Sequence, residues 1–273
     1  MIGNFYFKNF NLKEVDKSKN IDFSNQKGVY ETLKLREGVL FFPNDHIDRL
    51  FNSIKLFNLT DEINFSKQEL NDNLEELVEK NKLSDANIRI FFINQNESKE
   101  LYLMMFNPIF PNIELYKNGV KIISVHGVRK NSQVKYINPE TSQIFYEKAK
   151  NLGAYDALLV NGFVSEGTRT NIFFVKNGEF YTPPKERVLD GVTRKHVIDV
   201  IKNNGINIFE EDIMYNSLQN FDGAFLTGTS TLVMPVNSID HINFEIDNNI
   251  KYIQKKFDAY LNEYILNNKN GRN

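Results

Sequence analysis

Two periods in the hydrophobic pattern divide the first part of the chain into strands and a helix. Apolar and polar side chains alternate over residues 29–42 around Glu37-Gly38, which predicts a hairpin of two short strands. The period then becomes helical, which predicts a helix over 46–57 with Asn44 or Asp45 as its N-cap. Its apolar stripe comprises Ile47, Leu50, Phe51, Ile54 and Phe57.

A second helix, two further strands and a connector follow. The helix is expected over 66–81, where Ser66 caps the first turn and leucines recur at helical spacing. Strands over 87–93 and 101–106 complete a first block of α+β type. Two prolines, at 108 and 111, then favour an extended connector. The boundary is placed beside them, giving a small N-terminal domain, 1–112, and a larger C-terminal domain, 113–273.

The second block alternates strands, tight turns and helices. Asn161-Gly162 and Asn177-Gly178 are signals for type I′ turns, each between two short apolar strands. A helix is expected from Pro139, in its first turn, to Gly153 at its end. The remaining elements are strands over 120–125, 206–209 and 223–227 and helices over 192–203 and 247–267. The whole pattern indicates a two-domain protein of α+β or α/β class.

The composition argues against several classes of function but says little about the fold. Lys+Arg 33 against Asp+Glu 35 gives a formal charge of −2 without long runs of one sign, which argues against nucleic acid as a partner. There is no cysteine for a disulfide or a thiol nucleophile. No apolar run approaches ~18 residues and the start lacks a signal-peptide pattern, so no membrane contact and a cytoplasmic location are expected.

Several residues have the chemistry of a small-molecule site, each with a plainer alternative. Lys135 can form a Schiff base, although most lysines are solvated. Glu166 can hold a protonated pyridine nitrogen, or it is an exposed hairpin glutamate. Arg49 can bind a phosphate, or it lies on a helix surface.

Two glycine- and threonine-rich segments are candidate anion sites. Gly191-Val192-Thr193 opens a helix, where unpaired N–H groups favour an anion. Thr227-Gly228-Thr229-Ser230-Thr231 offers further donors after a strand, although both segments also have purely structural uses. No metal site is expected, because the histidines are scattered at His46, His126, His196 and His241. The motifs of serine hydrolases, Rossmann folds and P-loops are absent too.

The order of these residues resembles the class IV, fold-type IV enzymes that use pyridoxal 5′-phosphate. This family comprises branched-chain aminotransferases, D-amino-acid aminotransferases and aminodeoxychorismate lyase. Its signature is matched by Glu166, Arg169, Asn171-Ile172-Phe173, Phe180-Tyr181-Thr182 and Leu189-Asp190-Gly191-Val192-Thr193-Arg194. Further matches in the family's order are Gly28–Thr32, His46–Leu50, Lys135–Asn138 and Thr227–Ser230.

The resemblance implies a role for each residue and a homodimer with the cofactor between the domains. Lys135 matches the lysine that forms the Schiff base and moves the proton. Glu166 matches the carboxylate that pairs with the pyridine nitrogen. The phosphate ligands correspond to Arg49, Val192, Thr193 and Thr229. The residues on the substrate side correspond to Tyr30, Arg89 and Ser230.

Two departures bear on the reaction. Pro139 replaces a tyrosine that often follows Asn138 in family aminotransferases. Asn94-Gln95 replaces a frequent Arg-Gly, and residues 94–100 lack the substrate-binding arginine and histidine of D-amino-acid aminotransferases. An aminotransferase that acts on branched-chain-like amino acids and 2-oxo acids is the first hypothesis. The alternatives are a lyase of the aminodeoxychorismate type and a catalytically silent dimer that binds a metabolite.

Overall fold

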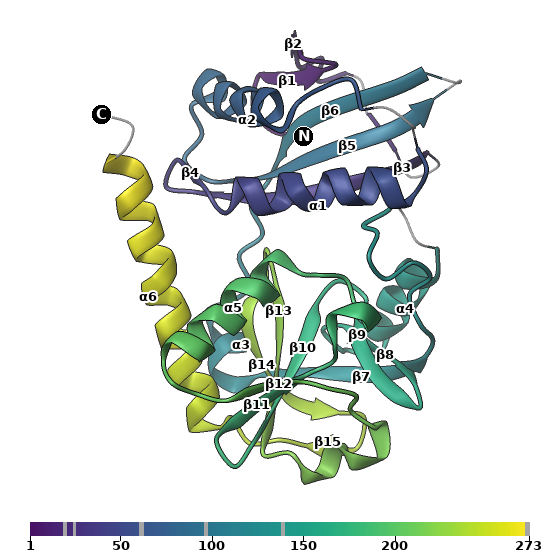
Figure 1. Ribbon diagram of the computed structural model, residues 1–273, viewed down its shortest axis with the longest axis vertical. Helices are drawn as coiled ribbons and strands as arrows, with labels where there is room; N and C mark the ends of the chain where they lie inside the picture. The colour runs from purple at the N-terminus through teal and green to yellow at the C-terminus, as the bar shows by residue number, and fades with distance from the viewer. Residues whose placement is uncertain (19–20, 24–25, 60–62, 96–97, 138–139, 271–273) are drawn as a thin grey trace. The chain divides into compact units, whose positions relative to one another are not determined.

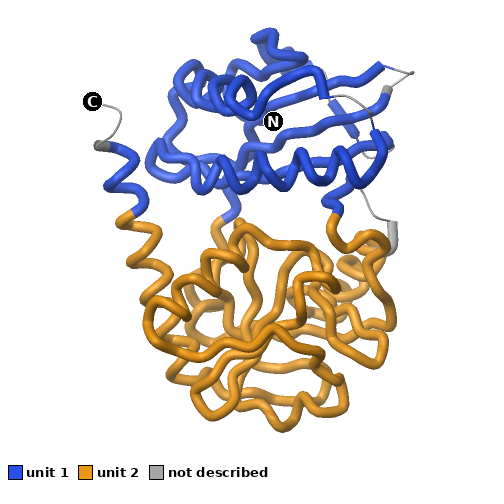
Figure 2. The backbone as a smooth tube through the Cα atoms, in the orientation of Figure 1, with its two compact units in different colours: residues 1–109, 134–138, 264–273 blue, residues 110–133, 139–263 orange. Residues whose placement is uncertain are grey.

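The chain forms two units in a computed structural model that describes residues 1–18, 21–23, 26–59, 63–95, 98–137 and 140–270 (Figure 2). Unit 1 comprises residues 1–109, 134–138 and 264–273, and unit 2 comprises residues 110–133 and 139–263. Lys135 therefore belongs to unit 1, although the segments on either side of 134–138 belong to unit 2. The domain limits 1–112 and 113–273 stay a prediction.

Unit 1 is an antiparallel sheet with two helices on one face (Figure 1). The helices are α1 (Pro43–Leu56) and α2 (Lys67–Asn81). The strands run in the spatial order β2-β1-β6-β5-β3-β4. Their bounds are β1 (Phe5–Lys8), β2 (Asn11–Glu14), β3 (Lys27–Arg36), β4 (Val39–Leu40), β5 (Ala86–Gln95) and β6 (Ser98–Phe106).

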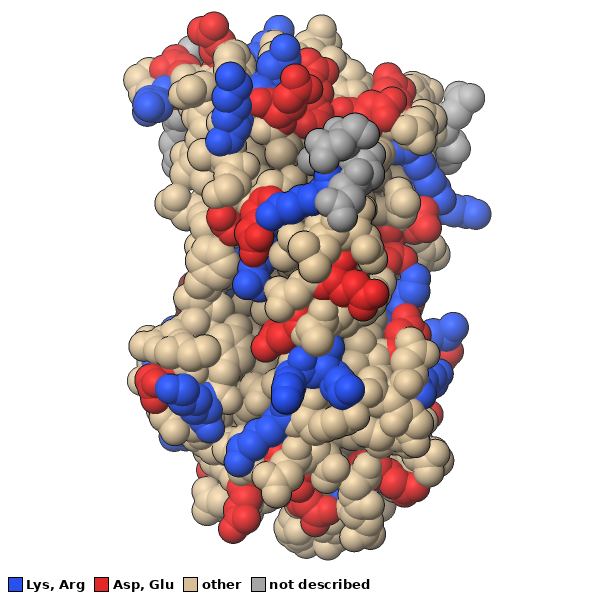
Figure 3. Space-filling model, turned by 90° about the vertical axis from the view of Figure 1, so that its left-hand side faces the viewer, with Lys and Arg blue, Asp and Glu red and all other residues tan. Residues whose placement is uncertain are grey.

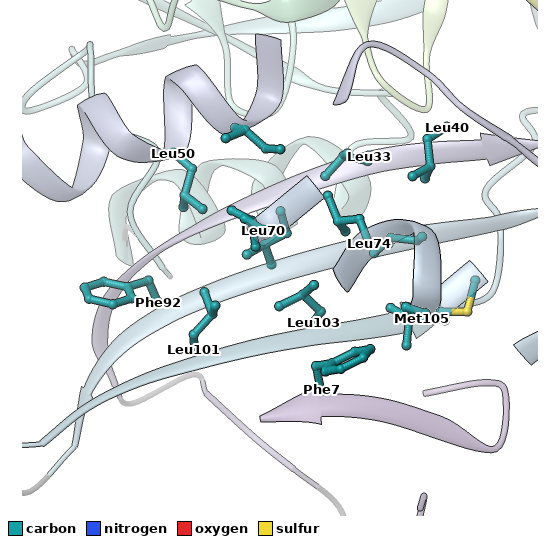
Figure 4. Close-up of a cluster of buried hydrophobic side chains, with 14 of the residues drawn as sticks. Phe7, Leu33, Leu40, Leu50, Leu70, Leu74, Phe92, Leu101, Leu103 and Met105 are labelled. Atoms are coloured by element: carbon teal, nitrogen blue, oxygen red, sulfur yellow. The ribbon is translucent and has the colours of Figure 1, made fainter. Parts of the chain in front are cut away.

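The core of unit 1 lies between this sheet and the two helices. Figure 4 shows Leu50 of α1 and Leu70 and Leu74 of α2 among side chains from β3, β5 and β6. Burial of each such leucine contributes about 1.5–3 kcal/mol. The alternate residues of the strands point to the other face, where Phe23 packs on Phe91 and Tyr102. The sheet is therefore apolar on both faces.

The predicted hairpin and second helix of unit 1 are confirmed, whereas the predicted cap of the first helix is wrong. Glu37 and Gly38 form the turn with φ of 51° and 78°. Ser66 Oγ accepts the Glu69 N–H and caps α2. However, α1 begins at Pro43, and Phe42 takes the N-cap position instead of Asn44 or Asp45. Proline at the first position lacks an N–H, so the helix start has one fewer donor to satisfy, and the Phe42 side chain cannot accept a hydrogen bond.

Unit 2 is a mixed sheet in the spatial order β12-β11-β10-β13-β14-β7-β8-β9, with β15 beside β14 (Figure 1). The pairs β11–β12, β14–β7 and β7–β8 are parallel. The bounds are β7 (Val120–His126), β8 (Ala157–Asn161), β9 (Phe163–Gly167), β10 (Asn171–Lys176), β11 (Glu179–Thr182), β12 (Ile208–Glu210), β13 (Gly223–Gly228), β14 (Leu232–Ile239) and β15 (Ile242–Asn243).

Helices pack against this sheet, which has an apolar core on each face. Ile172 and Phe174 of β10 belong to one core, whereas Phe173 stacks on Phe225 at 4.8 Å on the opposite face. Helix α5 packs against β13. The helical bounds are α3 (Ile113–Asn118), α4 (Glu140–Asn151), α5 (Val192–Asn203) and α6 (Asn248–Asn270), with 3₁₀ turns η1 (Lys185–Arg187) and η2 (Tyr215–Asn220).

Of the two type I′ turns predicted in unit 2, one is confirmed and the other is wrong. Asn177 and Gly178 both have positive φ, as a type I′ turn requires. Between β8 and β9 only Gly162 has positive φ, so a type I′ turn at Asn161-Gly162 is wrong. The helix start predicted at Pro139 lies outside the described residues, as does Asn138. None of the helices formed by the described residues has the length and apolarity needed to cross a membrane.

Candidate functional site

Glu166 lies near the end of β9 in a buried ion pair with Arg129. Arg129 Nε donates to Oε1 at 2.6 Å, and the Leu189 N–H donates to Oε2 at 3.2 Å. The side chains of Glu166 and Arg129 are only 2% and 7% exposed. A carboxylate buried in such a place needs hydrogen-bond partners of this kind. The alternative of an exposed hairpin glutamate is therefore wrong, while the cofactor role of Glu166 stays a prediction.

Sequence reasoning missed Arg129. It follows β7 in a polar loop, where nothing in the local pattern separates it from a solvated arginine. Its Nη2 also donates to the Thr168 carbonyl at 3.2 Å, so the guanidinium spans two points of the segment that carries Glu166. In the sequence, Arg129 is visible only as a positive charge before Lys135. Nothing in the pattern links it to Glu166, which lies 37 residues further along the chain.

The start of α5 lies against the segment that carries Glu166 and Asn171. The helix begins at Val192, as predicted, with Gly191 at the N-cap. A Cβ on Gly191 would clash with the amide oxygen of Asn171, so this approach needs glycine. Asn171 Nδ2 also donates to the Leu189 carbonyl at 2.9 Å, and the Leu189 N–H contacts Glu166. No side chain caps α5, so the first N–H groups of the helix can bind an anion.

The end of β13 supplies an observation that fits a bound phosphate. Thr227 is fully buried, and its hydroxyl has no hydrogen-bond partner among the described residues. Thr227 pairs directly with Asn171 of β10, so their side chains are neighbours on one sheet face. Asn171 in turn contacts Gly191 at the start of α5. An acceptor ligand at this helix start would satisfy a hydroxyl that is otherwise costly to bury.

Arg49 belongs to a buried polar cluster in unit 1. Its Nε and Nη2 each donate to Glu31 at 2.8 Å, and His46 Nδ1 lies 2.8 Å from Glu31 Oε2. Arg49 is only 10% exposed, so the alternative of a surface arginine is wrong. Burial disfavours the charge on Glu31, but Arg49 and His46 outweigh it and hold the pKa of Glu31 well below its usual range.

His46 completes this cluster as a neutral donor. Burial lowers the pKa of His46, against the opposing effect of Glu31. Because the ionised Glu31 only accepts hydrogen bonds, the neutral imidazole carries its proton on Nδ1. The cluster is therefore one anion, one cation and one neutral ring.

Lys135 is held at the edge of unit 1 through its backbone. The Lys135 N–H donates to Ser53 Oγ of α1 at 3.2 Å, and its carbonyl accepts the Tyr30 N–H at 2.9 Å. The side chain is half-buried, and Nζ lies 4.7 Å from the centre of the Tyr30 ring. The Lys135 ammonium therefore lies over the face of the Tyr30 ring in a cation–π contact.

Arg89 shares the sheet face of Tyr30. It pairs with Thr32, two residues from Tyr30 on β3, and its guanidinium lies 4.7 Å from the centre of the Phe106 ring. The structure thus brings Lys135 and Tyr30 together, whereas the guanidinium of Arg89 lies over Phe106. All three residues belong to unit 1, as does Arg49. Unit 2 holds Glu166, Val192, Thr193, Thr229 and Ser230.

Two further observations concern metal ligands and the distribution of charge in the described part of the chain. Within it, no three His, Asp or Glu side chains are grouped as metal ligands. On the face that Figure 3 presents, basic and acidic side chains are interspersed. Asn94, one of the family departures, lies on β5 opposite Lys27, whereas residues 96–97 fall outside the described residues.

The fold is that of the fold-type IV enzymes that use pyridoxal phosphate. Branched-chain amino acid aminotransferase from Escherichia coli superposes with a TM-score of 0.85 over 94% of both chains at 24% identity. The enzyme of the same name from Thermobaculum terrenum, solved in its PLP form, gives 0.83 over 94% of this chain and 92% of that chain at 21% identity.

Sequence comparisons define the family. Residues 28–239 match the model of the family described as amino-transferase class IV, and the chain belongs to that family as a class IV aminotransferase. A putative branched-chain-amino-acid aminotransferase from Methanocaldococcus jannaschii is 35% identical over 78% of both chains. A D-alanine aminotransferase from Bacillus licheniformis is 30% identical over 78% of this chain and 79% of its own length.

Proposed function

We propose that this aminotransferase binds pyridoxal phosphate and moves an amino group between a branched-chain-like amino acid and a 2-oxo acid. The observation that carries the proposal is the buried Glu166–Arg129 pair, which presents a fixed carboxylate beside a helix start suited to phosphate. The 35% identical relative from Methanocaldococcus jannaschii supports the branched-chain substrate. The absence of an arginine and a histidine in residues 94–100 argues against a D-amino acid substrate.

Residues of unit 2 would hold the ring nitrogen and the phosphate. Glu166 would accept a hydrogen bond from the protonated ring nitrogen, while Arg129 orients the carboxylate. The N–H groups of Val192 and Thr193 would bind the phosphate, joined by the hydroxyls of Thr193 and Thr229. The buried hydroxyl of Thr227 is a further donor for the same anion.

Residues of unit 1 would contribute the second phosphate contact and the reacting amine. Arg49, already oriented by Glu31, would add a positive charge to the phosphate. Lys135 Nζ would be the attachment point of the aldehyde and would then hold and move the proton of the substrate Cα. The bound cofactor supplies the electron sink for this proton transfer. Tyr30 keeps the amine in place, and Arg89 and Ser230 would face the substrate.

Two measurements test the proposal. Purified protein incubated with pyridoxal phosphate should become yellow, and borohydride should fix the cofactor to the peptide that contains Lys135. Lys130→Ala is the matched control for the site of attachment. Lys130 is exposed in the loop before Lys135, so the cofactor should still be fixed to the Lys135 peptide in this variant. A protein that stays colourless and takes up no cofactor would support the silent metabolite-binding dimer instead.

A substrate panel then decides the reaction. L- and D-amino acids are paired with 2-oxoglutarate or pyruvate, and transfer should be fastest with L-leucine, L-isoleucine or L-valine. Transfer from D-alanine alone would overturn the branched-chain assignment. Release of pyruvate from aminodeoxychorismate without an amino acceptor would identify the lyase.

We also propose a homodimer, which the family resemblance supports. Large apolar side chains of unit 2 are exposed in the single chain: Phe110 is 59%, Ile113 63% and Ile144 61% exposed. Light scattering on the purified protein should give twice the mass of the 31.8 kDa chain. A stable monomer that turns over the substrate would contradict this part of the proposal.

A further inference from the structure

A second buried carboxylate, Asp156, lies directly before β8 and accepts hydrogen bonds from five donors. Asp156 Oδ1 accepts the N–H groups of Ala157 and Thr168, at 2.8 and 3.2 Å, and the Thr168 hydroxyl. Oδ2 accepts the Thr170 hydroxyl at 2.8 Å and the Arg169 N–H at 3.4 Å. The residue is 2% exposed. Burial raises the pKa of Asp156, and the hydrogen bonds from Thr168, Thr170 and the backbone oppose that effect. A carboxyl group buried in this way needs such a donor set, because each lost donor leaves an oxygen unsatisfied.

The donors come mainly from one turn, residues 167–170, which follows Glu166. The turn is closed by the Gly167 N–H, which donates to the Thr170 carbonyl at 2.8 Å. A Cβ on Gly167 would lie 2.5 Å from Asp156 Oδ2 and would clash with the Thr170 hydroxyl. The carboxylate and the turn therefore fit each other closely, and the position of one determines that of the other.

The same turn fixes Arg129, the partner of Glu166. Thr168 gives its N–H and hydroxyl to Asp156 and its carbonyl to Arg129 Nη2 at 3.2 Å. Arg129 Nε then reaches Glu166 Oε1 at 2.6 Å. A continuous set of hydrogen bonds thus runs from Asp156 through Thr168 and Arg129 to Glu166.

We propose that Asp156 is a positioning residue for the ring-nitrogen contact of Glu166: it fixes the turn at 167–170, the turn fixes Arg129, and Arg129 fixes the Glu166 carboxylate. The inference rests on the proposed function, because it concerns how Glu166 meets the cofactor. A hydrogen bond to the ring nitrogen tolerates displacements of only about 0.5 Å. The phosphate and aldehyde contacts do not pass through this set of hydrogen bonds.

The proposal is tested by how strongly the protein prefers a cofactor with a ring nitrogen over one without it. We would measure the dissociation constants of pyridoxal phosphate and of its analogue in which a carbon replaces the ring nitrogen. The dissociation constant of the analogue divided by that of pyridoxal phosphate reports the Glu166 contact alone, because both molecules keep the phosphate and the aldehyde. A preference for the ring nitrogen makes this ratio greater than one. The native protein should prefer pyridoxal phosphate, and Glu166→Gln should bring the ratio close to one.

Asp156→Asn should lower this ratio by about 10-fold or more, the usual effect of removing an outer partner. The amide presents an NH₂ group where the Arg169 N–H or the Thr170 hydroxyl needs an acceptor. Asp240→Asn is the matched control: Asp240 is another loop-holding aspartate of unit 2, whose Oδ1 accepts the Ser124 N–H at 2.8 Å. This control should leave the ratio at its native value.

Each outcome has a distinct meaning. An equal loss of affinity for both cofactors in Asp156→Asn would show a merely structural role and overturn the inference. If that variant does not fold in a thermal scan, Thr170→Val, which removes one neutral donor, should lower the ratio in the same direction, and an unchanged ratio would overturn the inference. A native protein without preference for the ring nitrogen would instead overturn the assigned role of Glu166.

Discussion

The two units each contain a buried arginine–glutamate pair, but the member proposed to meet the cofactor differs. In unit 1, Glu31 holds Arg49, whose cation is the proposed phosphate ligand. In unit 2, Arg129 holds Glu166, whose carboxylate is the proposed ligand of the ring nitrogen. The pairs have similar burial and distances, so burial alone does not decide which member is functional.

The number of donors on each carboxylate explains the difference. Glu31 accepts three side-chain hydrogen bonds, two from Arg49 and one from His46. Glu166 accepts one from Arg129 and one from the Leu189 backbone. Since a carboxylate has about four acceptor sites, the described residues fill more of these sites on Glu31 than on Glu166, which leaves more of them for a ligand on Glu166.

The largest effect is expected for Glu166→Gln, which should lower kcat/KM by about 10²–10³-fold, the range for the loss of one electrostatic contact to the reacting system. A neutral amide does not keep the ring nitrogen protonated, whereas the phosphate and Lys135 contacts remain. Cofactor affinity should therefore fall far less than activity, as titration of the visible absorbance would measure. The exposed Glu211→Gln is the control. Equal losses of affinity and activity would contradict the role of Glu166.

Glu31→Gln should instead reduce the stability of the fold by about 3–5 kcal/mol, because it removes the negative charge that accepts two hydrogen bonds from the buried Arg49. The pKa of Glu31 is lowered from 4.5, so its contribution is complete above pH 4.5 and is lost as the pH falls below it. The difference in the free energy of unfolding between the native protein and the variant, measured in urea, should therefore be larger at pH 7 than at pH 4.

The control for this experiment is Glu37→Gln, which alters an exposed pair with Lys269 and should leave the unfolding midpoint unmoved. A Glu31 variant as stable as the native protein would mean that Arg49 does not depend on Glu31. The contrast between the two pairs would then lose its physical basis.

The smallest effect concerns Lys34, a buried cation that donates to the Ile109 carbonyl at 2.7 Å. Burial lowers the pKa of Lys34 from 10.5 to about 8. Between pH 8 and 10.5 the native state binds fewer protons than the unfolded state, so stability should rise with pH, by about 1–3 kcal/mol. Lys34→Met should abolish this rise, and Lys80→Met on the exposed face of α2 should retain it.

Local chemistry accounts for the elements that were predicted well, whereas no strand was predicted over the residues of β14. Ser66 and Gly191 sit beside the helices they start, so their effect is visible within a few residues of sequence. Pro235 argues against a strand, yet it pairs with Phe225 of β13 inside β14. Pairing of β14 with β7 begins only at Val236, so Pro235 lies where that neighbour is missing.

By itself, the sequence determined the hairpin of β3 and β4, the start of α5 and the positions of Lys135, Arg49 and Glu166 in a family pattern. These depend on the order and spacing of neighbouring residues. Tertiary structure alone decided which charges are buried together. Arg49 lies 18 residues from Glu31, and Arg129 lies 37 residues from Glu166. No periodicity connects such partners, because their proximity results from the pairing and packing of elements far apart in the chain.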